Sequence, residues 1–408
     1  MSPGLSAAEA AVLDRIEPAP ILARMLDWAA VNSGSGNLSG LAEMATRIGA
    51  AMAELPGEVR RHEPAPVTAI DAAGEERPIT RGAHLVLSVR PDAPRRVLLT
   101  GHMDTVFPAD HPFQTCRWRD AETINGPGTA DMKGGIALML AGLAAYEAAG
   151  VDGPLGYDVL INSDEEVGSL ASAPLIAELA RGKIAALTYE PALPSGAMAG
   201  ARPGSGNWSA VIHGRSAHAG RNPQDGRNAV LAAAALALRL AAAVRPGLSV
   251  NPAKIEGGSA NNVVPDMAIL RWNMRPRLPE DAQHALKVIR EAVAAVEAAH
   301  EVHIHLHGGL GRPPKPIDAG AERLFALVGQ AAADLGQPWS RGDTGGVCDG
   351  NNIAAQGVPV IDTMGALGGA IHSAEEFVHV PSLAARARLT ALTLLRIGAG
   401  GLQTGETK

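Results

Sequence analysis

Carboxylate and imidazole side chains recur in five short segments of the chain, and together they could bind two divalent metal ions. The segments carry a His followed two residues later by an Asp, then a lone Asp, a Glu pair, a single Glu and a late His. These residues are His102, Asp104, Asp131, Glu165, Glu166, Glu190 and His372. Two divalent ions roughly 4 Å apart deprotonate a water and polarise a carbonyl, as amide hydrolysis at neutral pH requires. The set therefore predicts metal-assisted hydrolysis.

Five of these side chains meet the ligand requirement of such an ion pair. One carboxylate must bridge both ions, and about two further ligands must hold each ion with a position left for water. The expected ligands are His102, Asp131, Glu166, Glu190 and His372. Carboxylates and imidazoles in this mixture suit Zn²⁺, with Co²⁺ or Mn²⁺ as substitutes. We therefore expect two Zn²⁺ per subunit.

Asp104 and Glu165 are expected to act beside the ligands. Asp104 lies two residues after His102 and could accept the second ring N–H, which would orient the imidazole. Adjacent residues that leave a strand point in different directions, so Glu165 could act as general base while Glu166 binds metal. Each segment alone has an ordinary interpretation, since Asp131 could cap a helix. Their joint occurrence favours a site.

The elements that must position these residues follow an α/β pattern. Apolar runs that alternate with amphipathic stretches predict an α/β layer fold with a mostly parallel central sheet. We expect strands over 85–89, 97–100, 157–161 and 185–189, and helices over 21–30, 41–53 and 134–148. His102, the Glu165–Glu166 pair and Glu190 each follow one of these strands. Open α/β sheets bind ligands at the carboxyl ends of their strands.

A second pattern occupies the middle of the chain. We expect a strand over 208–213, a helix over 228–244, strands over 248–255 and 267–274, a helix over 279–300 and a strand over 302–307. This order is a compact β-α-β-β-α-β unit. We therefore expect a smaller α+β domain over 206–311, inserted into a catalytic domain formed by 1–205 and 312–408.

Composition narrows the class of protein. The 408 residues include 35 Lys and Arg against 42 Asp and Glu, a net charge of −7, and no basic run is interleaved with aromatics. Nucleic-acid binding is therefore not expected. No segment reaches the roughly 18 apolar residues of a membrane span, and no export signal is recognised near Met1. Two cysteines, Cys116 and Cys348, form no disulfide framework, so we expect a cytoplasmic protein.

The same segments resemble the metal motifs of a known family. The run from Gly101 to Pro108 is similar to a first metal motif and the run from Gly128 to Gly135 to a second. Glu165–Glu166, Tyr189–Pro191 and Ile371–Ser373 follow in the same order. The chain thereby resembles the co-catalytic zinc metallopeptidases and amidohydrolases, which include glutamate carboxypeptidase, aminoacylase, acetylornithine deacetylase and succinyl-diaminopimelate desuccinylase.

This resemblance implies a role for each ligand. His102 and Glu190 would hold one zinc, Glu166 and His372 the other, and Asp131 would bridge them. Glu165 would be the base. A cis peptide bond is also expected after the bridging Asp, between Asp131 and Met132.

The resemblance also assigns residues outside the metal motifs. His218 would stabilise the oxyanion in the active site of a neighbouring subunit, so the inserted domain is expected to act as a lid and to form a homodimer. Asn262 would lie near the scissile carbonyl and Arg275 would bind the substrate carboxylate. Gly345 belongs to the late Gly-rich segment 342–351, whose backbone N–H groups would line the pocket. A loop histidine, a surface salt bridge and a plain turn are the structural alternatives.

Three functions remain open at this point. The favoured one is a carboxypeptidase that releases a C-terminal, glutamate-like amino acid from a small peptide, because His218, Arg275 and the Gly-rich segment recur together as in the glutamate carboxypeptidase branch. The second is an N-acyl amino acid deacylase. The third is a protein that binds metal or ligand without turnover, which the retention of Glu165 disfavours.

Overall fold

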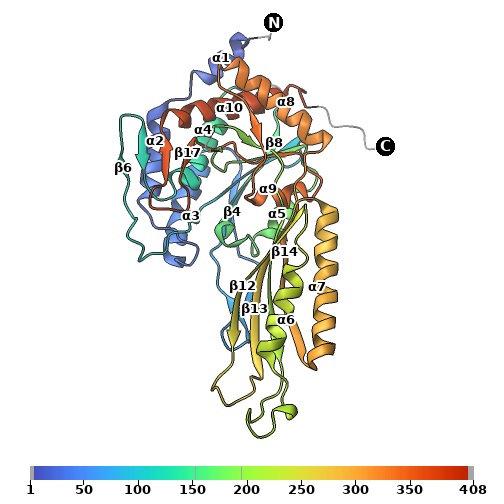
Figure 1. Ribbon diagram of the computed structural model, residues 1–408. Coiled ribbons are helices and arrows are strands. Elements are labelled where there is room, and N and C mark those ends of the chain that lie inside the picture. The colour runs from blue at the N-terminus through green and yellow to red at the C-terminus, as the bar shows by residue number, and fades with distance from the viewer. Residues whose placement is uncertain (1–3, 152, 194, 403–408) are drawn as a thin grey trace.

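The computed structural model describes residues 4–151, 153–193 and 195–402. Two parts lie end to end along the long axis of the molecule (Figure 1). The larger part contains a six-stranded sheet and most of the helices, and the smaller part contains a four-stranded sheet with two long helices on one face. The chain therefore divides its secondary structure between two separate sheets.

The central sheet is mixed, and its parallel half contains the strands that precede the predicted site residues. Its strands in spatial order are β1 (Glu58–His62), β4 (His84–Val89), β8 (Gly156–Asn162), β5 (Arg96–His102), β9 (Ala185–Thr188) and β16 (Val360–Ile361). β8, β5, β9 and β16 run parallel, whereas β4 is antiparallel to both β1 and β8. The four predicted strands all lie in this sheet. Only the direction of β4 departs from the parallel pattern.

Helices cover both faces of the central sheet, which explains why its inner strands β8, β5 and β9 are buried on both sides. α4 is buried almost all round and packs against α2 and α10, while α5 and α9 cover the opposite face through a cluster that includes Leu98, Ile176 and Ile353. The helices of this part are α1 (Ala7–Leu13), α2 (Pro18–Ala29), α3 (Leu38–Met52), α4 (Gly134–Glu147), α5 (Ala173–Ala180), α8 (Ala319–Asp334), α9 (Asp349–Ala354) and α10 (Pro381–Gly398). The α/β layer fold is confirmed.

The smaller part has its own sheet and its own core. In spatial order its strands are β12 (Leu248–Gly257), β13 (Met267–Pro276), β11 (Ser205–His213) and β14 (His303–Arg312), and its helices are α6 (Ala229–Ala241) and α7 (Pro279–His300). All neighbouring strands are antiparallel. Trp208 and Trp272 stack within a core that α6 and α7 close. Along the chain the order is the predicted β-α-β-β-α-β.

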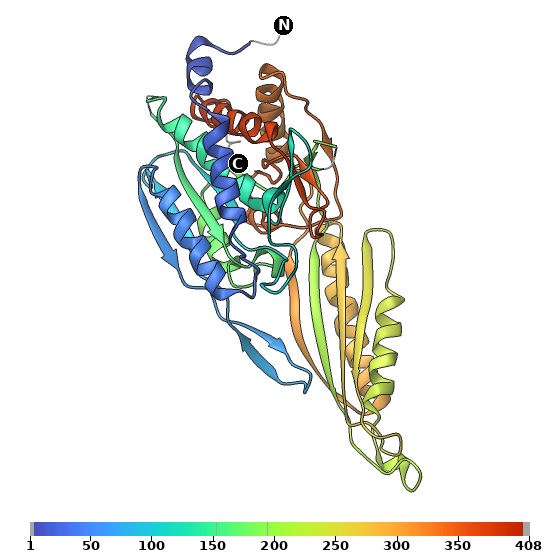
Figure 2. The same ribbon diagram turned by 90° about the vertical axis from the view of Figure 1, so that its left-hand side faces the viewer.

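Several short elements escaped the sequence pattern. They are β2 (Val67–Ile70) with β3 (Glu76–Ile79); β6 (Arg117–Trp118), β7 (Thr123–Asn125), β17 (Gly368–Gly369) and β18 (Phe377–His379) in one sheet; β10 (Met198–Ala199) with β15 (Arg341–Gly342); and the single turns η1 (Thr129–Lys133), η2 (Glu165–Val167) and η3 (Pro223–Asp225). Strands this short show no period in the sequence. The β2–β3 hairpin reaches down from the larger part to the sheet of the smaller one (Figure 2).

The hairpin and the Asn351 side chain of α9 are two of the contacts that connect the two parts. Ile70 of the hairpin packs with Val211 and Ile269, and Arg271 Nη2 donates to the Ile70 carbonyl at 2.9 Å. At the root of the smaller part, the buried Asn351 amide donates to the carbonyls of Pro203 at 2.9 Å and Pro313 at 2.8 Å. One amide group therefore holds both segments by which the chain crosses between the parts.

Candidate active site

The five predicted ligands converge at the carboxyl ends of the parallel strands. His102 ends β5, Glu190 follows β9, and Glu166 lies in η2 just after β8. Two groups form, His102 with Asp131 and Glu190, and Asp131 with Glu166 and His372, and within each group one ligand atom per residue lies within 4.8 Å of the others. Asp131 belongs to both groups, which is the arrangement that a bridging carboxylate requires.

Distances within the two groups are short. His102 Nε2 lies 3.1 Å from Asp131 Oδ1 and 3.8 Å from Glu190 Oε2. His372 Nε2 lies 3.3 Å from Asp131 Oδ2 and 3.1 Å from Glu166 Oε2. The two carboxylate oxygens of Asp131 therefore face different imidazoles, Oδ1 that of His102 and Oδ2 that of His372.

Burial and protonation show why this donor set fits divalent cations. Glu190 Oε1 is buried without a hydrogen-bond partner, although buried carboxylates normally have one. Burial, together with the neighbouring Asp131 carboxylate, raises the pKa of Glu166 to about 8. Asp131 and Glu166 raise the pKa of His372 to about 10. Crowded carboxylates thus retain protons that a bound cation would displace.

The other two ligands respond to the same crowding. Burial disfavours the charged form of His102, but its hydrogen bonds to Asp104, Asp131 and Glu190 raise the pKa of this imidazole well above its usual value. Burial also opposes ionisation of Asp131, yet His102 and His372 lower the pKa of that carboxyl. Asp131 is therefore the most acidic member of the set, as suits a carboxylate shared by two cations.

The main-chain N–H groups of the turn that carries Asp131 are bound by a residue that the sequence did not reveal. Glu376 is buried, and its carboxylate accepts N–H groups from Gly128 and Ala130 at 3.0 Å and from Asp131 at 3.1 Å. Burial raises the pKa of Glu376 to about 7. Gly128 has φ of 68°, which favours glycine, and the Asp131–Met132 peptide is cis as expected. Glu376 shows no local motif because its partners lie about 250 residues away in sequence.

Two backbone features help to place Glu190 and His372. At Gly135, the start of α4 approaches β9 so closely that an added Cβ would lie 2.2 Å from the Tyr189 carbonyl oxygen, directly before Glu190. His372 has a left-handed φ of 63°, and Ala370 has 51°. Non-glycine residues adopt this conformation at a cost, and such residues cluster at functional sites. The backbone at Ala370 and His372 is therefore strained, and this conformation places the His372 side chain beside Asp131 and Glu166.

Asp104 supports the site through more contacts than expected. Its carboxylate accepts the Ser35 hydroxyl at 2.7 Å and the main-chain N–H groups of Glu165 at 3.1 Å and Glu166 at 3.2 Å. His102 Nδ1 donates at 3.0 Å to the main-chain carbonyl of Asp104, while the Asp104 carboxylate lies farther away at 3.4 Å. The carbonyl, rather than the predicted carboxylate, is the nearer partner of the imidazole. The carboxylate instead fixes the Glu165–Glu166 turn.

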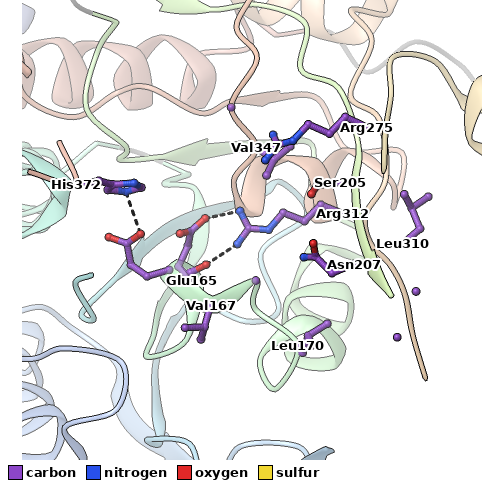
Figure 3. Close-up of a pocket in the computed structure, with 16 residues that line it drawn as sticks. Glu165, Val167, Leu170, Ser205, Asn207, Arg275, Leu310, Arg312, Val347 and His372 are labelled. Carbon is purple, nitrogen blue, oxygen red and sulfur yellow. Dashed lines mark hydrogen bonds and ion pairs between the residues drawn. The ribbon is translucent and has the colours of Figure 1, made fainter. Parts of the chain in front are cut away.

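Glu165 is bound by an arginine that the sequence analysis did not single out. Arg312 Nη1 donates to Glu165 Oε1 at 2.5 Å, and Nη2 donates to the Glu165 main-chain carbonyl at 2.8 Å (Figure 3). Burial raises the pKa of Glu165, although Arg312 acts in the opposite direction. A carboxylate with a raised pKa beside a guanidinium suits a general base.

A pocket of about 730 Å³ opens from this centre. Glu165, Glu166 and His372 lie at one end, and Arg275 lies at the other (Figure 3). The Arg275 guanidinium donates from Nη1 to the Gly345 carbonyl at 3.0 Å. Between these ends the wall is formed by Val167, Gly168, Leu170, Ser205, Asn207, residues 308–312, Gly346 and Val347. The structure therefore places Arg275 and Gly345 together, with the carbonyl of Gly345 rather than its N–H engaged.

His218 and Asn262 lie away from the pocket. Both are exposed, and the Ala219 N–H donates to the Asn262 carbonyl at 3.0 Å. The segment 214–228 that contains His218 forms the end of the smaller part farthest from the central sheet (Figure 1). A single chain therefore brings together the metal ligands, Glu165 and Arg275, but not these two residues.

Neither a cysteine nucleophile nor a membrane-spanning helix finds support in the described residues. Burial raises the pKa of the Cys348 thiol well above its usual value, which leaves no thiolate to act as nucleophile. Among the residues described, no helix is long and apolar enough to cross a membrane.

Comparison with known proteins agrees with this geometry. Over 387 residues, 91% of this chain and 87% of the relative, the sequence is 29% identical to carboxypeptidase G2 of Pseudomonas sp. (strain RS-16). It is 30% identical over 280 residues to succinyl-diaminopimelate desuccinylase of Halorhodospira halophila, covering 64% of this chain and 71% of that one. A tripeptidase structure from Staphylococcus aureus superimposes with a TM-score of 0.71 and 24% identity over 95% of this chain and all of the other.

The resemblance seen in the metal motifs extends through most of the chain. Residues 98–396 match the sequence profile of peptidase family M20/M25/M40, and this range contains both ligand groups, Glu165 and the whole smaller part. With the two ligand groups sharing one Asp at the ends of parallel strands, the chain belongs to peptidase family M20/M25/M40.

Proposed function

We propose that this protein is a dimeric two-zinc carboxypeptidase that releases a C-terminal, glutamate-like amino acid. The observation that carries the proposal is the pocket itself, which has carboxylate and imidazole ligands at one end and the Arg275 guanidinium at the other. A guanidinium pairs well with a carboxylate. An amide held with its neighbouring α-carboxylate on Arg275 would thus present its carbonyl to the ligand groups.

Family membership makes the chain a metal-dependent peptidase or amidohydrolase. The residues that would hold two Zn²⁺ are His102 and Glu190 on one side, Glu166 and His372 on the other, and Asp131 between them. A bound pair of divalent ions lowers the pKa of a water and polarises the scissile carbonyl. Co²⁺ or Mn²⁺ would fit the same donors.

The side chains of the pocket supply the proton transfers and the orientation. Glu165 takes a proton from the attacking water and passes it to the leaving nitrogen, so that water adds across the amide to give a carboxylic acid and an amine. Asp104 keeps Glu165 and Glu166 in place through their main-chain N–H groups. Arg275 holds the substrate carboxylate, which fixes the distance between carbonyl and base.

A second copy of the chain would complete the site. Leu231 and Leu238 lie one heptad apart on α6 with 59% and 73% of their surface exposed, beside the edge strand β12. An apolar helix face next to an unpaired strand edge suits a symmetric dimer. We propose that His218 of the partner subunit then stabilises the oxyanion and that Asn262 of the partner subunit lies near the scissile carbonyl.

An N-acyl amino acid deacylase is the second candidate. Relatives named succinyl-diaminopimelate desuccinylase match about two thirds of the chain, and the pocket would hold an acyl group as well as a peptide. Both reactions cleave an amide beside a free carboxylate and use the same residues.

A cytoplasmic location, in agreement with the free thiols of Cys116 and Cys348, is part of the proposal.

An assay of zinc-loaded protein separates the two candidates. The panel contains dipeptides with C-terminal glutamate, aspartate, leucine and lysine, and the acetyl, succinyl and benzoyl derivatives of the same amino acids. Preference for C-terminal glutamate among the peptides supports the carboxypeptidase. Hydrolysis of acyl amino acids alone favours the deacylase, and hydrolysis of neither set, with zinc content verified, contradicts the proposal.

A further inference from the structure

Arg312 belongs to one part of the molecule by its main chain and to the other by its side chain. It is the last residue of β14, where it pairs with Ser205 of β11 in the sheet of the smaller part. Its guanidinium enters the catalytic centre and is buried, with 4% of the residue exposed. The pocket contains one other guanidinium among its described lining residues, that of Arg275.

Both terminal nitrogens of the Arg312 guanidinium bond Glu165. Nη1 bonds the Glu165 carboxylate at Oε1, and Nη2 bonds the Glu165 main-chain carbonyl at 2.8 Å. Because one rigid fork spans the main chain and the side chain of Glu165, the rotamer of Glu165 is constrained at both ends. Among the described residues, the one hydrogen bond of this carboxylate involves Oε1, so Oε2 remains available to accept a proton from water.

The fork is itself held from behind. Ser169 Oγ accepts from Nη2 at 2.8 Å and donates to Asp349 Oδ1 at 2.5 Å, and Asp349 Oδ1 lies 3.7 Å from Nη2. Asn162, the last residue of β8, donates to the other oxygen of Asp349 at 2.7 Å. Arg312 is therefore locked into the scaffold, in contrast to Arg275, which is half-buried and bonded to an exposed loop carbonyl.

We propose that Arg312 is a positioning residue for Glu165: it fixes the carboxylate so that one oxygen faces the attacking water, and it links that placement to the sheet of the smaller part. This inference rests on the proposed role of Glu165 as base. A buried guanidinium already engaged by three oxygen atoms is poorly suited to bind the substrate carboxylate, a role that fits Arg275.

The decisive variant is Arg312→Lys, which keeps the charge and removes the fork. With the best substrate of the panel, kcat is expected to fall by about 10- to 100-fold, since a misplacement of about 1 Å has an effect of this size. KM and the inhibition constant of free glutamate, the product, are expected to stay unchanged. Zinc content is measured in parallel and is expected to match the wild type.

Arg396→Lys is the matched control. Arg396 likewise bonds through two of its guanidinium nitrogens, with Nε 3.0 Å from Glu9 Oε1 and Nη1 2.7 Å from Asp334 Oδ2, but it lies outside the residues that line the pocket. The same substitution there is expected to leave kcat and KM unchanged. A crystal structure of Arg312→Lys adds a readout without turnover, in which the Glu165 carboxylate is expected to change its orientation.

Two results would overturn the proposal. A rise in KM and in the glutamate inhibition constant with kcat retained would place Arg312 on the substrate, and an unchanged Glu165 orientation in the crystal would exclude positioning. If Arg312→Lys does not fold, Ser169→Ala decides: it removes one hydroxyl behind the fork, so kcat should fall at constant KM, and an unchanged kcat contradicts the proposal. Should the wild type hydrolyse nothing, the proposed function fails, while the crystal comparison still tests the Arg312 contact.

Discussion

The metal centre and the far end of the smaller part differ in how completely one chain builds them. His102, Asp131 and their partners lie within 4.8 Å of one another in each group, and most are buried. His218 and Asn262 are exposed on neighbouring loops at the end of the smaller part farthest from the central sheet. One chain thus brings together all five proposed metal ligands, whereas the proposed oxyanion donor would come from a second chain. The two regions should therefore respond differently to substitution and to dilution.

The largest effect is expected at the metal centre, which one chain builds completely. Glu165→Gln keeps the size of the base and removes its ability to accept a proton, so kcat should fall by about 10³- to 10⁴-fold. Zinc stoichiometry, measured by metal analysis, should not change. Glu178→Gln, on the exposed face of α5, is the control and should behave as wild type. Retained activity in Glu165→Gln would show that another group is the base.

A complementation experiment tests the far end of the smaller part, where His218 is proposed to serve the active site of a second chain. His218→Ala should lower kcat by about 10²- to 10³-fold, because one oxyanion donor is lost. Mixing and reassociating His218→Ala with Glu165→Gln should restore about a quarter of wild-type activity, since half of the dimers are mixed and each has one intact site. His305→Ala, an exposed histidine on β14, serves as control. No recovery from mixing, with dimers verified, would mean that His218 does not act across subunits.

Arg275 lies between the two regions and should show an intermediate effect. Arg275→Met removes the guanidinium but preserves much of the apolar stem, so KM should rise by about 10- to 100-fold, the value of one or two charge-assisted hydrogen bonds. The exposed Arg277, two residues farther along the chain, provides the control variant Arg277→Met. A change in kcat alone would be inconsistent with a substrate anchor.

The smallest effect is a pH dependence confined to the metal centre. Without metal, the pKa of His372 is raised to about 10 and that of Glu166 to about 8, so both carry protons at pH 7. Zinc must displace these protons, and its apparent affinity should therefore rise as pH rises, by about tenfold per pH unit for each proton released. Calorimetry in buffers of different ionisation enthalpy counts the protons. Zinc affinity that is constant from pH 6 to 8 would contradict the assignment of these ligands.

The sequence predicted the parts of the molecule that leave a local pattern. Short apolar runs located β4, β5, β8 and β9, and the ligands were recognisable because most of them directly follow strands or a glycine-rich turn. The antiparallel direction of β4 was missed, because a strand buried on both faces shows the same apolar run in either direction.

Residues that act through distant contacts could not be found in this way. Glu376 holds the Asp131 turn, and Arg312 holds Glu165, from positions far away in sequence. Neither lies in a motif that would distinguish it from an ordinary surface charge. Their burial, with 1% and 4% exposed, is the signal, and it exists only once the chain has folded.

The β2–β3 hairpin gives the smaller part a second point of attachment to the larger part. The sheet is clamped at its root by Asn351 and supported again farther out, where Ile70 packs on Val211 and its carbonyl binds Arg271. Because the sheet of the smaller part is attached at these two places, it cannot rotate about the Asn351 contacts without moving the hairpin. Any rotation of the smaller part would therefore also displace the hairpin, which residues 63–66 and 80–83 connect to β1 and β4 of the larger part (Figure 2).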